Sequence, residues 1–347
     1  MARSTPLFAL VFLLWHGLLM AKEPQEIAYK PLNPSYIELT KLLNTDLVND
    51  DEQSIKVSLQ ALNTQKSSFA RYNLIYWELA FHYANLKQYN QVMSVLQLGQ
   101  DEGLFFFFQD GEQPFPAFLS ELKSQQGFEK FYKQNQALIA KANDTSQMQY
   151  MLQIPNTYNK DKNYPLLIIM HGGIGSINDL QYHFDSERLQ SEFIVAYVQG
   201  AALAGFFGRR FKEGSWQVDI NKIYQLITSQ YSIDLEKVVL AGPSMGAMRS
   251  IQLAISKSFP VKGLLLPFPV IPSGLTRETY DTWAKSDLRM AIMSGEHDWA
   301  FDAQKQFFIQ LEAHSVNNRF LIFPELGHEY PDDFQRHINS SLSYLLY

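Results

Sequence analysis

The order of apolar and polar positions predicts buried strands separated by helices over the carboxyl-terminal two thirds of the chain. The run Tyr164 to Met170 is continuously apolar, which is typical of a strand covered on both faces. Further strands are predicted at Met148 to Ile154, Phe193 to Val198, Val238 to Ala241, Lys262 to Pro267, Arg289 to Ser294 and Arg319 to Phe323. Helical patterns lie around Leu180 to Ser191, Val218 to Tyr231, Ala247 to Lys257 and Ala303 to His314, and again from about Asp332. This alternation predicts a mostly parallel sheet with helices on both faces.

A second pattern, helical throughout, precedes this α/β part. Ser35 to about Asn63 predicts two helices separated by an acidic turn, and Phe118 to about Asn143 predicts helices as well. Aromatic and small residues between them come close to the spacing of one tetratricopeptide helical hairpin, at Tyr76, Leu79, Ala80, Tyr83, Tyr89, Val92 and Leu96. Because such hairpins need neighbours for stability, we expect a small all-α domain packed on the α/β domain. Amphipathic helices whose aromatic residues simply fill a core are the other interpretation.

Four consecutive phenylalanines, Phe105 to Phe108, follow the helical hairpin. Neighbouring side chains on a helix or strand cannot all face one side, so some of these rings must contact another element. We expect them at a domain interface, and an apolar substrate-binding wall is the alternative. A linker at Asp144 and Thr145 then leads into the α/β domain.

The first residues have the features of a secretory signal. Arg3 precedes an apolar stretch of about 14 residues within Pro6 to Met20, and the small residue Ala21 stands before a charged segment. The stretch is shorter than the roughly 20 residues that span a bilayer. We therefore expect cleavage after Ala21 and export, to a periplasm or out of the cell, with no integral membrane segment left; an uncleaved anchor is the alternative. The predicted division is a signal peptide at 1–21, a helical domain at 22–145 and a catalytic domain at 146–347.

One strand ends in a sequence that can carry an exposed serine. Val238 to Ala241 is followed by GPSMG at 242–246 and then by a helical stretch. In the order strand, tight turn, helix, the pattern Gly-x-Ser-x-Gly is typical of a nucleophile elbow, in which the serine takes a strained backbone conformation. The hydroxyl of Ser244 is then expected at the carboxyl end of the strand.

A serine hydroxyl is a poor nucleophile, so it needs a base within hydrogen-bond reach and a third group that holds the tautomer of the base. Asp298 and His328 each lie in the loop after a predicted strand. Ser244 is therefore the candidate nucleophile, His328 the candidate base and Asp298 the candidate orienting carboxylate. The nearby acids Glu296 and Asp302 remain alternatives to Asp298.

The loop after the strand at 164–170 reads HGGIG, and glycines there let backbone N–H groups approach a substrate oxygen. The N–H groups of Gly173 and Met245 are the candidate oxyanion hole for a tetrahedral intermediate. His171 in the same loop is expected to be structural rather than catalytic.

Together these features resemble the α/β-hydrolase superfamily, whose catalytic residues follow the chain order serine, acid, histidine. More narrowly, YPLLIIMHGGIGS, YSIDLEKVVLAGPSMGA, SGEHD and GH are similar to the serine esterases that include polyhydroxybutyrate depolymerases and feruloyl or acetyl-xylan esterases. The resemblance covers about Met148 to Tyr347. It implies a carboxylic-ester hydrolase that uses Ser244, His328 and Asp298 in these roles, acting on a small-molecule or polymer-borne ester. Ala247 stands where such enzymes often have glycine.

The long loop Gln199 to Trp216 leaves a strand at the same edge of the sheet, where substrate contacts are common. Arg209 and Arg210 are candidates for contacting a substrate carboxylate, and Trp216 is a candidate for a substrate-binding surface. A solvated basic pair and a packing tryptophan are the structural alternatives.

Composition excludes several functional classes. Hydrophobic residues make up 46% of the 347 residues, which excludes a disordered chain, and the formal charge of -6 provides no basic patch for nucleic acid. The chain contains no cysteine, which rules out disulfides and thiolate metal sites. His297 and its acidic neighbours cannot converge on one ion, so we expect neither a metal nor a cofactor.

Two other functions stay open from the sequence. The same three residues cleave peptide bonds in prolyl-oligopeptidase-like enzymes, so the chain could be an exported peptidase. Alternatively, the helical domain binds a protein partner, and the hydrolase scaffold has no activity. The presence of Ser244, Asp298 and His328 argues against the second interpretation, because packing alone does not require all three.

Overall fold

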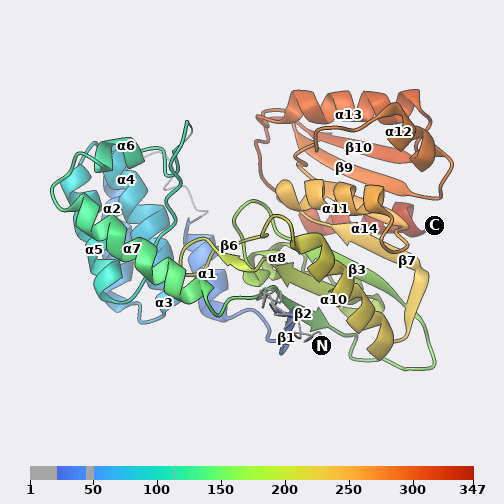
Figure 1. Cartoon of the computed structure of the whole chain (residues 1–347), viewed down its shortest axis with the longest axis horizontal. Coiled ribbons are helices and arrows are strands. Elements are labelled where there is room, and N and C mark those ends of the chain that lie inside the picture. The colour runs from blue at the N-terminus through green and yellow to red at the C-terminus, as the bar shows by residue number, and fades with distance from the viewer. Residues whose placement is uncertain (1–21, 44–50, 113) are drawn as a thin grey trace, which may run out of the picture.

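The computed structural model describes residues 22–43, 51–112 and 114–347. An eight-stranded sheet with its helices makes up one side of the molecule, and a helical region lies beside it (Figure 1). The strand order is β1-β2-β4-β3-β7-β8-β9-β10. β2 runs antiparallel to β4, and all neighbours from β4 to β10 are parallel. The strands are β1 Gln25–Ile27, β2 Gln149–Gln153, β3 Tyr164–Met170, β4 Ile194–Gln199, β7 Ile233–Ala241, β8 Gly263–Pro267, β9 Arg289–Gly295 and β10 Asn318–Phe323.

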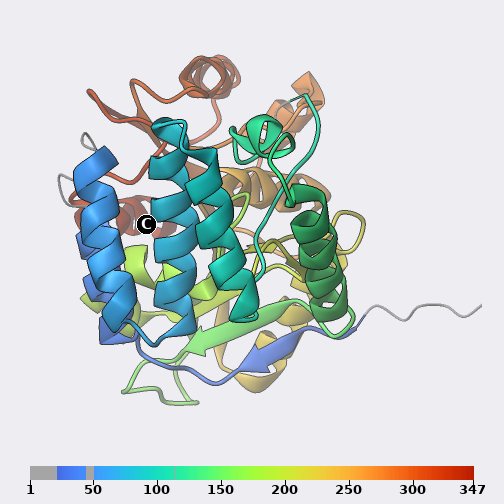
Figure 2. The ribbon, with the colours of Figure 1, turned by 90° about the vertical axis from the view of Figure 1, so that its left-hand side faces the viewer.

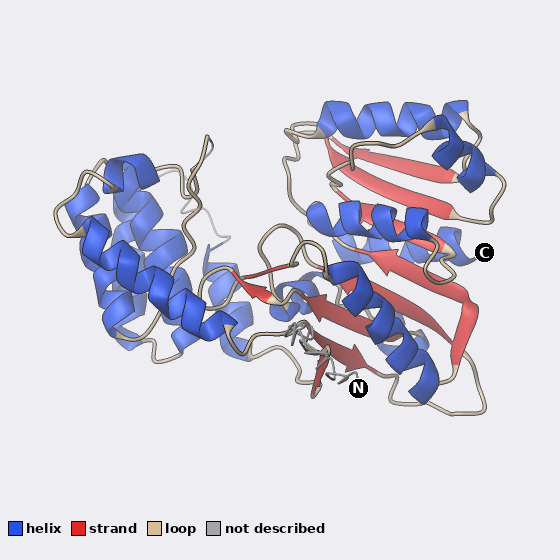
Figure 3. Cartoon of the chain, viewed as in Figure 1, coloured by secondary structure: helices blue, strands red, loops and turns tan. Residues whose placement is uncertain are grey.

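Helices cover both faces of this sheet (Figure 3). Residues of α10 to α13 pack on one face, and residues of α8, α9 and α14 pack on the other. These helices are α8 Ile177–His183, α9 Glu187–Glu192, α10 Trp216–Gln230, α11 Met245–Ser256, α12 Arg277–Ala284, α13 Phe301–Ala313 and α14 Phe334–Leu346. The predicted fold class is confirmed as a mostly parallel sheet with helices on both faces together with an all-α region, although β1 comes before that region in the chain.

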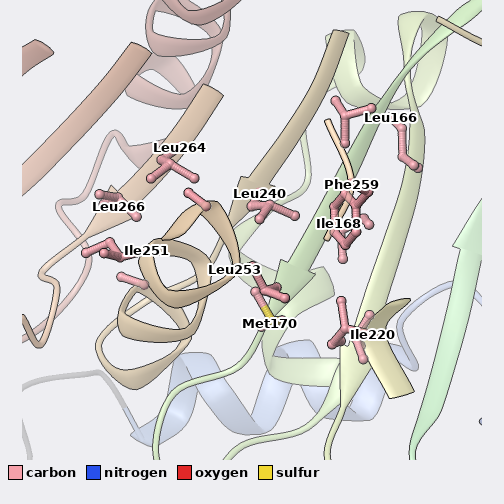
Figure 4. Packing of buried hydrophobic residues seen from close by; sticks show 14 of the residues in the cluster. Leu166, Ile168, Met170, Ile220, Leu240, Ile251, Leu253, Phe259, Leu264 and Leu266 are labelled. Carbon is pink, nitrogen blue, oxygen red and sulfur yellow. The ribbon is translucent and has the colours of Figure 1, made fainter. Parts of the chain in front are cut away.

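Alternate residues of the central strands face opposite helical layers. In β3, Leu166, Ile168 and Met170 face α10 and α11, and Figure 4 shows this cluster from close by. Leu167 and Ile169 face α8 and α14 instead, and all five side chains are completely buried. Each such side chain contributes roughly 1.5–3 kcal/mol through removal from water. A strand with two apolar surroundings has no polar face, which explains the continuous apolar run.

The region between β1 and β2 is helical (Figure 2). It has a hydrophobic core of its own. Its elements are α1 Pro34–Leu43, α2 Asp51–Thr64, α3 Ser68–Asn73, the π-helical turn η2 Leu74–Leu79, α4 Ala80–Asn85, α5 Tyr89–Asp101, α6 Leu119–Leu122 and α7 Phe128–Asn143. Five residues of the repeat-like spacing are completely buried, namely Tyr76, Leu79, Ala80, Val92 and Leu96. The spacing therefore identifies core positions of this region, while membership of a repeat family stays a prediction.

The run of four phenylalanines divides between this core and the contact with the α/β part. Phe106 and Phe108 belong to the helical core. Phe105 meets Phe206 of the loop after β4, with ring centroids 5.2 Å apart, and its carbonyl accepts a hydrogen bond from the Phe206 N–H at 2.8 Å. The expected interface therefore involves Phe105, whose side chain points away from that of Phe106 because successive side chains of an extended segment point to opposite sides.

The amino-terminal segment differs from the prediction. The predicted helical domain covers residues 22–145, but Gln25–Ile27 form β1, which pairs in parallel with β2. The sheet therefore begins before the helical region. A strand of three residues carries too little periodic pattern to be recognised among the prolines around it.

Two helical predictions also differ. The helix expected around residues 180–191 is broken into α8 and α9, because Ser186 caps a new helix by accepting a hydrogen bond from the Leu189 N–H. α12, whose start is capped in the same way by Thr276, is not among the predicted helices. Within α12 the buried residues are Tyr280 and Trp283, too few for a clear helical periodicity.

The predicted signal peptide, Met1 to Ala21, lies outside the described residues. Over the described ranges, none of the helices has the length and apolar character needed to cross a membrane. Export therefore stays a prediction from the sequence.

We expect Asn135 to be essential for the helical core. Its Oδ1 accepts the Phe106 N–H and its Nδ2 donates to the Phe106 carbonyl, both at 2.7 Å, and the side chain is completely buried. Asn135→Ala leaves two buried backbone groups unpaired, which should lower the free energy of unfolding by about 2–4 kcal/mol. Thermal denaturation compared with the exposed control Gln134→Ala measures this loss. Equal stability of the two variants would contradict the assignment.

Candidate active site

Ser244 lies in the turn between β7 and α11 and has an unusual backbone conformation. Its φ of 53° and ψ of -119° are rarely adopted by residues that carry a side chain. Glycines on either side make the turn possible, because a Cβ on Gly242 or Gly246 would lie 2.1 Å from the carbonyl oxygen of Met170. The two glycines of the motif therefore let the turn pack against the end of β3.

The structure brings Ser244, His328 and Asp298 into one hydrogen-bonded chain. His328 Nε2 lies 2.8 Å from Ser244 Oγ, and His328 Nδ1 lies 2.9 Å from each carboxylate oxygen of Asp298. A carboxylate can only accept, so Nδ1 carries the proton and Nε2 is left to accept from the serine hydroxyl. Of the acids considered from the sequence, Glu296 and Asp302 are exposed, whereas Asp298 is buried and contacts the histidine.

Asp298 is held by donors other than His328. Its Oδ1 accepts the Ala300 N–H at 2.8 Å, and its Oδ2 accepts from Gln304 Nε2 at 2.9 Å. Gln304 is completely buried on α13, and its Nε2 also donates to the Pro269 carbonyl at 3.1 Å. Gln304 cannot be recognised from the sequence, because a glutamine early in a helix usually faces water. The one feature of the sequence that pointed to Gln304 is its position six residues after Asp298.

Two aromatic side chains flank the His328 ring. Phe268 meets it edge-on with ring centroids 4.9 Å apart, and Trp299 lies tilted over it at 5.0 Å. Phe268 has a φ of 32°, and its N–H donates to the Met293 carbonyl at 2.6 Å. Trp299 is 72% exposed, so an apolar ring stands at the surface beside the histidine. Neither residue had been singled out from the sequence.

Ser244 and His328 open onto a cavity of about 730 Å³, which we call the Ser244 cavity. Gly173 lines it, and a Cβ on Gly173 would meet no described atom within 4 Å. Met245 is the first residue of α11, so its N–H has no carbonyl partner within the helix. Gly173 therefore lies where an approaching oxygen atom has room, whereas Met245 follows Ser244 but does not line the cavity, and its part in an oxyanion hole stays a prediction.

The charge of the Ser244 cavity is one-sided. Among the described residues that line it, no lysine or arginine occurs. The acidic residues of the lining are Asp179, Glu329 and Asp332. An anionic substrate group would therefore meet repulsion here, and an uncharged group would not.

His171 is structural, as the sequence analysis expects. The Gly200 N–H donates to His171 Nε2 at 3.0 Å, so the proton lies on Nδ1, which is 2.9 Å from the Gly172 carbonyl oxygen. Burial, with a smaller contribution from the cationic Arg249 and Arg209, lowers the pKa of His171 to about 3. The imidazole is therefore neutral and links the loop after β3 to the loop after β4.

Arg209 and Trp216 do not line the cavity onto which Ser244 and His328 open. Arg209 Nη1 donates to Ser146 Oγ at 3.0 Å and to the Gln147 carbonyl at 3.3 Å, which ties the loop to the segment before β2. Trp216 is 5% exposed and belongs to the core under α10. Neither residue lines the Ser244 cavity, so the geometry of this cavity gives the substrate-binding prediction for Arg209 and Trp216 no support. The conformation of the loop between β4 and α10 decides which side chains face the cavity, and the position of a residue in the sequence does not predict that conformation.

His297 is exposed, and its Nδ1 lies 3.8 Å from a carboxylate oxygen of Glu325. In the part of the chain that the structure describes, no three His, Cys, Asp or Glu side chains gather as they would around a metal ion.

Comparison with known proteins bears on the fold. No protein-family model and no curated protein matches the sequence. An uncharacterized protein from Bacillus cereus ATCC 10987 is similar in structure, with a TM-score of 0.50, 17% identity, and coverage of 89% of this chain and 98% of that chain. A Bacillus cereus carboxylesterase has a TM-score of 0.45 at 19% identity, covering 59% of this chain and 98% of its own. An esterase from Thermogutta terrifontis has a TM-score of 0.46 at 12% identity, covering 58% and 88%. At such identities the reaction has to be argued from the site.

The neutral state of His171 makes stability depend on pH. Its pKa is about 3 in the folded protein and about 6.5 when unfolded, so its contribution is complete above pH 6.5 and is lost as the pH falls toward 3. Between pH 7.5 and 5 the loss should be about 2 kcal/mol. His171→Gln, which can still accept from the Gly200 N–H, should not show this loss. Denaturant titrations of both proteins at the two pH values measure it. A stability difference that does not change with pH would contradict the neutral, buried imidazole.

Proposed function

We propose that the protein is a serine hydrolase that cleaves carboxylic esters, with Ser244 as nucleophile, His328 as general base and acid, and Asp298 as the orienting carboxylate. The observation that carries the proposal is the unbroken hydrogen-bonded chain from the Ser244 hydroxyl through His328 to the buried Asp298. The position of Ser244 also supports the proposal, because this serine has a strained backbone conformation at the carboxyl end of a parallel strand.

In the first half-reaction, Ser244 Oγ attacks the ester carbonyl carbon while His328 Nε2 takes the hydroxyl proton. The imidazolium that forms is stabilised by the carboxylate of Asp298. Collapse of the tetrahedral intermediate breaks the bond to the alcohol, which leaves with the proton that His328 held. Water then attacks the acyl-enzyme with His328 as base, and the acid is released as Ser244 regains its proton.

The backbone N–H groups of Gly173 and Met245 act as the oxyanion hole in this proposal. Two oriented dipoles stabilise negative charge that develops in the transition state without any reorganisation, and removing one such donor typically slows acyl transfer by two to three orders of magnitude. The N–H of Met245 also lies at the amino terminus of α11, where the helix dipole favours an anion.

The substrate class, the export of the protein and the separate helical domain are part of the same proposal. The resemblance of Met148 to Tyr347 to esterases that include polyhydroxybutyrate depolymerases and feruloyl esterases makes short-chain and hydroxycinnamoyl esters the first substrates to screen. The apolar start at 1–21 supports export to a periplasm or out of the cell. The hydrophobic core between β1 and β2 supports a separate helical domain.

A fluorophosphonate probe tests the nucleophile directly. We expect modification of wild-type protein at Ser244, located by mass spectrometry, and none in Ser244→Ala or His328→Ala. His328→Ala should also slow ester turnover by at least about a thousandfold, because the serine loses its base. Circular dichroism confirms that each variant is folded. Modification of another residue, or undiminished labelling of His328→Ala, would rule out the assignment.

Gln304 should matter through Asp298. In Gln304→Leu the carboxylate loses one of its donors and can rotate away from His328, so kcat should fall roughly ten- to hundredfold while KM changes little. Gln310→Leu, at an exposed position of the same helix, is the matched control. Steady-state kinetics on a short-chain ester separate kcat from KM. If kcat is the same in both variants, Gln304 does not position Asp298.

A further inference from the structure

A second cavity lies beside the Ser244 cavity. It measures about 270 Å³, and we call it the helix-side cavity. Ile174, Gly175 and Asp179 line both spaces, so the two cavities adjoin along this rim. An ester bound at Ser244 in the first cavity could therefore extend a substituent across this rim into the helix-side cavity.

One face of the helical region forms the far wall of the helix-side cavity. Phe69, Tyr72, Asn73 and Trp77 line it. Their spacing of three, four and eight positions from Phe69 places them on one side of the continuous helix made by α3 and η2. Trp77 is 36% exposed, whereas its neighbour Tyr76 is completely buried. The wall includes part of a π-helical turn, an uncommon element that is frequent at functional sites.

Aromatic contacts hold this wall against the α/β part. Phe207, from the loop after β4, meets Phe69 edge-on at 5.1 Å and Tyr72 at 5.8 Å. Tyr36 of α1 stacks on Phe69 at 4.7 Å, and its hydroxyl donates to the carboxylate of Asp179. Both sides of the cavity are thus fixed by packing that needs no ligand, which lowers the entropic cost of binding.

The chemistry of the helix-side cavity selects for an uncharged apolar group. Phe69, Tyr72, Trp77 and Phe207 supply aromatic surface, and the described lining contains no lysine or arginine. Asp179 would repel an anion, and it already accepts hydrogen bonds from other residues of the protein. A dry cavity of about 150 Å³ can hold benzene, so a space of 270 Å³ is large enough for one substituted ring.

We propose that the helix-side cavity binds the part of the ester that is remote from the scissile bond, and that this part is uncharged, apolar and no larger than about one substituted ring. The inference rests on the proposed ester hydrolysis at Ser244. It assigns the helical region to substrate selection rather than to the capture of a protein partner.

Kinetics on matched esters test the inference. Methyl butyrate provides the reference, 2-phenylethyl butyrate carries a ring on the alcohol side, and methyl 4-phenylbutyrate carries one on the acyl side. The readout is kcat/KM for each ring ester divided by kcat/KM for methyl butyrate. Trp77→Ala removes part of the aromatic wall and should lower this ratio five- to tenfold for at least one ring ester. Asn73→Phe fills the cavity and should lower the same ratio at least as much.

Leu98→Ala is the matched control, because Leu98 is an exposed apolar residue of α5 that does not line the helix-side cavity. Its ratio should equal that of the wild type. Unchanged ratios in both Trp77→Ala and Asn73→Phe would overturn the inference. The two variants change the cavity in opposite ways, so a folding defect in one leaves the other as a test.

Failure of the proposed function is distinguishable from failure of this inference. If wild-type protein hydrolyses none of the three esters, the catalytic proposal fails, and calorimetric titration with 2-phenylethanol then tests the cavity by itself. Weaker binding to Trp77→Ala than to Leu98→Ala supports the apolar site. Equal binding to the two variants, or none to the wild type, overturns it.

Discussion

The carbonyl oxygen of Met170 determines how closely the turn around Ser244 can approach the end of β3. Any side chain at Gly242 or Gly246 would collide with it, so both positions require glycine. Because the turn packs closely on the end of β3, Ser244 is fixed at the edge of the sheet. Its carbonyl accepts a hydrogen bond from the Val270 N–H at 3.2 Å. The loops after β3 and β8 are thereby placed around Ser244. His328 and Asp298 can act only if their positions match that of the Ser244 hydroxyl.

Short stretches of adjacent residues were sufficient to predict the buried strands and the loops that carry the candidate catalytic residues. The strands buried on both faces, the elbow, and the two loops that carry Asp298 and His328 all follow from runs of adjacent residues. Their convergence followed from the parallel sheet. The partners of Asp298 could not be predicted in this way, since Gln304 acts through a contact made when α13 packs beside β9.

The loop after β4 shows why residue type alone misleads. Arginines and a tryptophan at an active-site edge suggest substrate contacts, yet Arg209 binds backbone and side-chain oxygens near β2, and Trp216 fills the core. The aromatic residues of the loop do reach across, but to the helical region: Phe206 meets Phe105, and Phe207 meets Phe69. Which surface such a loop contacts is set by an element far away in sequence, and no local pattern records it.

β1 and β2 are paired neighbours although the whole helical region lies between them in the chain. In terms of topology, that region is an insertion between adjacent strands rather than a module attached in front of the sheet. A segment anchored at both ends in one sheet cannot swing about a single hinge, and moving it away would strip the β1–β2 ladder. A chain shortened to begin at β2 would also present an unpaired strand edge, the kind of surface on which copies of a protein associate.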